Sequence, residues 1–164
     1  MKRTFTKIKF KQDKVFLTYT QKNSQGKDDA YSVEISEAPA PGFTKALENL
    51  AQDVLTICEL PTDEDTLKTI KVLGVSISHT DTETEGVVRG FTISALKDLK
   101  DSNSPLVLNT PHKPEAPYSK SGDNSNCLYL ETVERIDTLI EEAEKYLKGH
   151  RAQVSMGFDE KKAA

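Results

Sequence analysis

Three segments in the first 35 residues alternate apolar and polar side chains, at residues 4–11, 15–20 and 31–35. A repeat of two residues is typical of a β-strand with one face in the core and the other in water. Short polar connections at 12–13 and 22–29 join these segments. They predict that the strands follow one another as an antiparallel meander.

The rest of the chain changes period. Apolar residues fall at helical spacing over 41–58 and 128–147, whereas 69–78 and 86–96 return to alternation around a polar hairpin tip at 79–86. The pattern predicts an α+β fold in the order β-β-β-α-β-β-α, with two helices packed on an antiparallel sheet.

The chain after the second helix is polar and too short to form a core element. Gly149 follows the last helical position, where glycine commonly caps a helix. We therefore expect residues 1–149 to form a single domain and residues 150–164 to be a flexible tail carrying a peptide motif.

The composition excludes several classes of protein. No apolar run approaches the roughly 18 residues of a membrane span, so no membrane partner is expected. The basic N-terminus lacks the apolar segment of a secretory signal. Two cysteines, Cys58 and Cys127, with three scattered histidines predict neither a disulfide framework nor a structural zinc site. A cytoplasmic protein with reduced thiols and no metal is expected.

The net charge of −4 hides an uneven distribution. Residues 1–27 hold eight basic side chains and one acid, whereas the remainder is strongly acidic. A basic end on an acidic body favours a polyanionic partner such as DNA. The candidate contacts on the first hairpin are Lys7, Lys9, Lys11 and Lys14. The alternative is that these lysines only protect an exposed strand from unwanted pairing.

A long stretch from 97 to 126 has weak periodicity. A short extended piece at 104–109 is followed by three prolines and a polar run. Loops this long in a compact domain are often functional. The candidate ligand-binding residues are Asn109, Thr110, His112, Tyr118 and Asp123. The alternative is a structural loop, stiffened by prolines that end any strand pairing.

Motifs of common enzymes are missing from the sequence. It contains no phosphate-binding Gly-Lys-Ser/Thr loop, no His-Glu-x-x-His and no Gly-x-Ser-x-Gly. Neither cysteine has an adjacent histidine that would mark a nucleophile. A non-enzymatic protein without a cofactor is the expectation.

The tail carries two large apolar side chains in a polar context. Residues 153–158 read Gln-Val-Ser-Met-Gly-Phe, which resembles the hexapeptide that binds the bacterial β sliding clamp. The matching positions are Gln153, Ser155, Met156 and Phe158. Glutamine can both donate and accept hydrogen bonds, and the two apolar side chains can fill adjoining subsites. The resemblance implies the clamp as a partner.

A second resemblance covers roughly residues 70–158. The stretch 106–119, the following Gly122–Asp123 and the acidic helix ending at Lys148–Gly149 resemble an uncharacterised family of bacteriophage and prophage proteins associated with replication and recombination. Members often end in Gln-x-x-Leu-Phe, from which Met156–Phe158 departs. The family implies a bacterial host cytoplasm and no particular chemistry. The expected function is a replication or recombination accessory. The alternative is a small-ligand or counter-defence module that uses residues 104–126.

Overall fold

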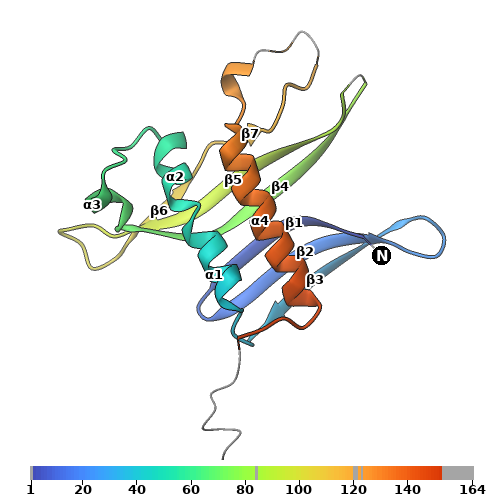
Figure 1. Ribbon diagram of the computed structural model, residues 1–164, viewed down its shortest axis with the longest axis horizontal. Coiled ribbons are helices and arrows are strands. Elements are labelled where there is room, and N and C mark those ends of the chain that lie inside the picture. The colour runs from blue at the N-terminus through green and yellow to red at the C-terminus, as the bar shows by residue number, and fades with distance from the viewer. Residues whose placement is uncertain (1, 84, 120–121, 123, 153–164) are drawn as a thin grey trace, which may run out of the picture.

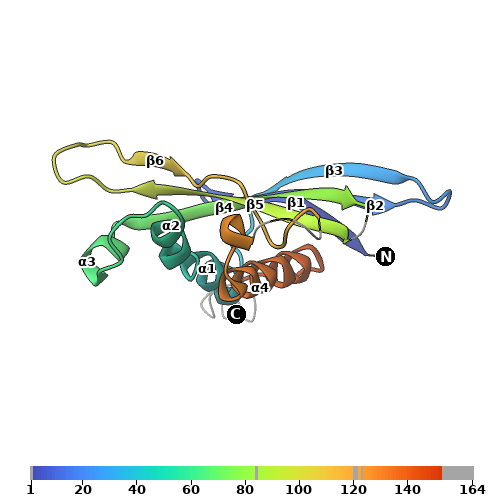
Figure 2. The same cartoon turned by 90° about the horizontal axis from the view of Figure 1, so that it is seen from above.

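A computed structural model describes residues 2–83, 85–119, 122 and 124–152. It confirms the predicted α+β class: one antiparallel sheet, with helices on one of its faces (Figures 1 and 2). The sheet order is β3-β2-β1-β4-β5-β6, and β7 also pairs with β5. The strands are β1 (Arg3–Lys11), β2 (Lys14–Lys22), β3 (Asp28–Ile35), β4 (Ile70–Thr82), β5 (Gly86–Lys97), β6 (Leu106–Asn109) and β7 (Lys113–Pro114).

The helices lie together below the sheet in Figure 2, and the other sheet face carries none of them. They are α1 (Pro41–Glu48), α2 (Ala51–Ile57), α3 (Glu64–Leu67) and α4 (Leu130–Leu147), with a 3₁₀ turn η1 at Asn124–Asn126. The alternation predicted for the strands places Ile8, Leu17 and Ile93 in the core, where they pack with the helices. Among the described residues, no helix has the length and apolarity needed to cross a membrane.

The helix predicted over 41–58 is divided in two. The Leu50 amide donates a hydrogen bond to the Leu47 carbonyl, three residues back. The hydrogen bonding between α1 and α2 is therefore of the 3₁₀ type at this point. The Gln52 side chain donates to the carbonyl of Asn49 at 3.1 Å. Leu50 itself is fully buried. The chain bends there while keeping the apolar positions of both helices against the sheet.

The part of the chain that packs on the domain extends past the boundary predicted at Gly149. Arg151 pairs with Pro39 in an isolated β-bridge, and its guanidinium carbon lies 3.8 Å from the centre of the Tyr146 ring. The Ala152 amide donates to the carbonyl of Ala38 at 2.9 Å. Residues 151 and 152, assigned to the flexible tail from sequence, are therefore held against the domain.

A buried ion pair joins α2 to α4. Asp53 is 3% exposed and receives hydrogen bonds from the Arg135 guanidinium at 2.7 and 2.8 Å and from the Thr132 hydroxyl at 2.6 Å. The hydrogen bond to Asp53 raises the pKa of Arg135 against the opposing effect of burial. The buried carboxylate therefore depends on Arg135 for its counter-charge.

Replacing Arg135 by methionine should destabilise the fold strongly. The variant keeps the aliphatic packing of Arg135 but leaves the buried Asp53 carboxylate without its cation, which typically costs about 3–5 kcal/mol. Urea denaturation measures the loss in the free energy of unfolding. The double variant Asp53→Asn with Arg135→Met removes the uncompensated charge and should recover more than half of it. A double variant as unstable as the single one would contradict this account.

Candidate functional site

The sheet face opposite the helices, here called the open face, carries mainly polar side chains in its centre and the apolar Leu96 and Val107 toward its β6 edge. Its membership follows from the strand register, because neighbours along a strand point to opposite faces. In the centre, Lys7 pairs with Ser76, and Ser76 pairs with Thr92. The residues of the open face used below are Lys7, Lys9, Lys11, Lys14, Phe16, Thr18, Gly74, Ser76, Ser78, Gly90, Thr92, Ser94, Asn109 and His112.

Three of the predicted lysines form a row along β1. Lys7, Lys9 and Lys11 alternate with core positions, so successive members are about 6.8 Å apart along the strand. Burial and then the charges of Lys7 and Lys11 lower the pKa of Lys9. Within the described part of the chain, no carboxylate lies within 4.0 Å of these three ammonium groups. The row is a concentration of unneutralised positive charge.

Lys14 differs from the other predicted lysines. Its ammonium lies 3.3 Å from the Glu34 carboxylate on β3, and both side chains are about half exposed. This pair stands at the edge of the open face, so the sequence-predicted basic set divides into three unpaired lysines and one paired lysine.

Gly74 permits the close approach of β4 to β1 beside the lysine row. A Cβ at this position would overlap the Ile8 carbonyl oxygen and would lie 2.7 Å from Cγ of Lys9. The register also shifts between Val72 and Gly74, which marks a bulge. The glycine therefore lets β4 approach β1 without a clash against Ile8 or Lys9.

The predicted loop after residue 104 runs along the β5 edge of the sheet. β6 pairs with β5 as expected for a short edge strand, and Thr110 then exchanges two hydrogen bonds of 2.9 Å with the Ile93 backbone. The expectation that the prolines end strand pairing is wrong, because Lys113–Pro114 pairs again with β5 as β7. An edge strand tolerates Pro114 because one of its sides needs no donor. The Pro114 carbonyl accepts a hydrogen bond from the Leu128 amide.

Two predicted ligand residues of this edge belong to the open face. The His112 ring lies over Gly90, where any Cβ would overlap it, and its Nε2 is 2.9 Å from the Ser78 hydroxyl. The Ser94 hydroxyl donates to the Asn109 side-chain oxygen at 2.7 Å. Both residues therefore share one face with the lysine row. The pairings Lys9–Gly74, Gly74–Ser94 and Ser94–Asn109 place Lys9 and Asn109 about 14 Å apart across three strand spacings.

The remaining predicted residues do not join this group. Thr110 is buried, and its hydroxyl accepts a hydrogen bond from the Ile93 amide. Tyr118 is 43% exposed in the segment after β7. Asp123 lies outside the described residues, as do the clamp-motif residues Gln153, Ser155, Met156 and Phe158. The structure places Asn109 and His112 on the same sheet face as the lysine row, three strand spacings away in the case of Asn109, and Tyr118 in a separate segment.

An ion network that the sequence analysis missed fixes the edge segment. The Arg89 guanidinium contacts both Glu115 oxygens at 2.9 Å and an Asp137 oxygen at 2.7 Å, so it ties β5, the chain after β7, and α4 together. Burial alone would raise the pKa of Glu115, but hydrogen bonds and charge from Arg89 outweigh it and lower the pKa. The partners lie 26 and 48 residues away, and no local pattern signals them.

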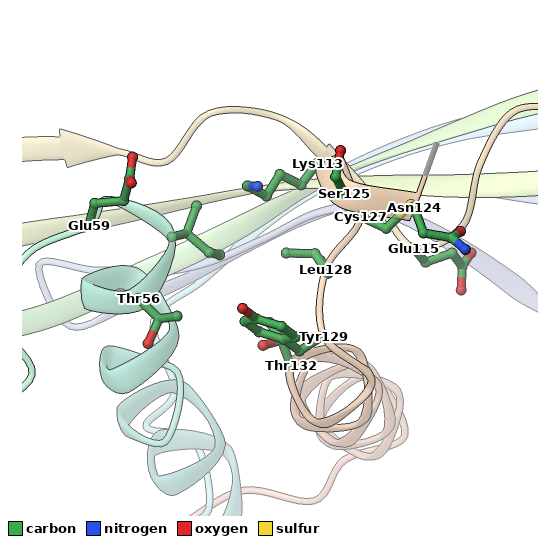
Figure 3. Close-up of a pocket in the computed structure, with 11 residues that line it drawn as sticks. Thr56, Glu59, Lys113, Glu115, Asn124, Ser125, Cys127, Leu128, Tyr129 and Thr132 are labelled. Atoms are coloured by element: carbon green, nitrogen blue, oxygen red, sulfur yellow. The ribbon is translucent and has the colours of Figure 1, made fainter. Parts of the chain in front are cut away.

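A groove of about 650 Å³ lies on the helix side of the same edge (Figure 3). Lys113 extends from β7 toward the end of α2, and the Tyr129 ring stands at the start of α4. Glu59 and Glu115 also line the groove, so its charges are mixed. Cys127, another lining residue, is an unpaired thiol. Within the described ranges, no group of three or more histidine, cysteine or acidic residues is placed to hold a metal ion.

Comparisons with protein-family models, curated proteins and solved structures found no match for this chain.

The Arg89 network should make stability depend on acid pH. Because the pKa of Glu115 is lower in the folded chain, its contribution is present above the ordinary value of 4.5 and is lost as pH falls through the folded value. Glu115→Gln should flatten the decrease in unfolding free energy below pH 4.5. Denaturation at a series of pH values measures the slope. An unchanged slope would show that Glu115 does not supply this dependence.

Proposed function

We propose that this protein is a non-enzymatic accessory of DNA replication or recombination that binds the β sliding clamp of a bacterial host. The observation that carries the proposal is the sequence of residues 153–158, in which Gln153, Ser155, Met156 and Phe158 match the clamp-binding hexapeptide. The cytoplasm of the host is the corresponding location.

The attachment of the preceding residues supports this proposal. The Arg151 side chain donates to the Tyr146 carbonyl at 2.9 Å and lies 3.1 Å from the Glu37 carboxylate. Ala152 is bonded to Ala38 beside the start of α1. The motif thus begins one residue past a fixed point on the surface, which gives a bound clamp a short connection to the domain.

The motif's chemistry suits a short peptide that binds an apolar pocket. Met156 and Phe158 offer large apolar surfaces, whereas Gln153 can pair with backbone groups of a partner. Ordering a short segment opposes binding, so a micromolar dissociation constant is expected for one such contact.

Replacing Phe158 by alanine should weaken clamp binding by about 1–3 kcal/mol, or roughly 5- to 150-fold, because an apolar subsite is emptied. Surface plasmon resonance of the full chain over immobilised β clamp measures the dissociation constant. Asp159→Ala, one residue beyond the motif, is the matched control and should bind as the parent does. No binding by the parent chain at high micromolar concentration would overturn the proposed function.

A further inference from the structure

We propose that the open face binds a single strand of nucleic acid, with phosphates along the lysine row of β1 and bases across β4 and β5 toward β6. The sequence analysis predicted contact with DNA from the basic hairpin alone. The structure adds the neighbouring strands and the edge that carries Asn109 and His112. This site is independent of the clamp motif and would function without it.

Charge complementarity identifies the occupant. Lys7, Lys9 and Lys11 point from one strand to one face, and their spacing of about 6.8 Å is close to the separation of successive phosphates in an extended strand. Each ammonium lacks a neighbouring carboxylate within the described residues. Crowding of like charges raises the free energy of the empty face, and a bound polyanion relieves it.

The opposite side of the molecule repels the same ligand. Helix α4 contains six acidic and two basic residues, and it covers the helix side of the sheet (Figure 2). The chain's net charge of −4 is thus distributed so that one face is basic and the other acidic. A nucleic acid is directed to the open face although the whole protein is an anion.

Small side chains leave room for bases beside the lysines. Gly74, Ser76, Thr92 and Ser94 occupy the adjoining positions of β4 and β5, so the side chains next to the lysine row are small. The hydroxyls of Ser76 and Thr92 can donate and accept hydrogen bonds. At the far side, Asn109 keeps its amide donors available while its oxygen accepts from Ser94.

A single strand fits this face better than a duplex. The distance of about 14 Å from β1 to β6 accommodates a backbone with its bases laid to one side. A duplex is a stiff cylinder, so it would contact the lysine row and turn its bases away from β5. Phe16 pairs with Lys9 across β1 and β2, so it lies on the side of the lysine row away from β4 and β5 and does not contribute to this base path.

The helix-side groove of Figure 3 is less suited to an anionic ligand than the open face. Lys113 is accompanied there by Glu59 and Glu115, so an anion gains little. The open face has both the unpaired charge and the extended width.

Fluorescence anisotropy with a labelled oligothymidylate of about 20 nucleotides tests the proposal on the full chain at low salt. The parent should bind, and affinity should fall with salt by about 0.7 log units per log unit of salt for each phosphate contacted. Lys7→Glu with Lys9→Glu should weaken binding at least about tenfold and reduce the salt slope. The matched control is Lys45→Glu with Lys148→Glu, which makes the same charge change on the helix side and should bind as the parent does.

A second pair of variants separates the whole face from the hairpin alone. Ser94→Glu places a carboxylate on β5, two strands from the lysines, and should weaken binding severalfold if bases cross that strand. Thr56→Glu on α2 is its control. Thermal melting of each variant checks that it is folded. The proposal is overturned by absence of binding to the parent at low salt, by unchanged binding of folded Ser94→Glu, or by a duplex of equal length that binds as tightly as the single strand.

Discussion

Coverage of the sheet from one side only is the constraint on which the rest of this structure depends. The helices bury Ile8, Leu17 and Ile93 together with their own apolar residues, and this supplies the core. Every second strand residue then faces away from any helix and must be compatible with water. The lysines and hydroxyls of the open face satisfy this requirement. The same requirement leaves a broad polar surface on which a ligand can lie.

Specific polar contacts complete that one-sided core. Asp53 with Arg135 fixes α2 against α4, and Arg89 with Asp137 and Glu115 fixes α4 against the β5 edge. Apolar burial has little directional preference, whereas paired charges restrict how the helices sit on the sheet. Arg89 also holds Glu115 just after β7, so it fixes the chain at the end of the edge segment that carries His112.

The fold class was predictable from sequence because strands and helices depend on local periods. The alternation in residues 4–11 places its lysines on one face of a strand whatever its neighbours are. The break near Leu50 was not predictable from the pattern, because the apolar spacing continues through it. The return of Lys113–Pro114 to the sheet was also missed. Proline excludes a central strand but not an edge strand, and sequence alone did not show that this segment lies at an edge.

The relation between the two predicted sites required the sheet order. Lys9 and Asn109 are far apart in sequence, and each was considered with its own segment. The order β1-β4-β5-β6 places their backbones three strands apart on one face. His112 similarly contacts Ser78, 34 residues away.

The attachment of Ala152 to Ala38 lies beside the start of α1, on the helix side of the sheet. The last described residue before the clamp motif is thus attached on the face of the sheet opposite the proposed nucleic-acid site. Under the two proposals, one small chain would hold both the clamp and a single strand of nucleic acid through two independent contacts. Even if each contact were weak, linking them would raise the local concentration of the second partner once the first had bound.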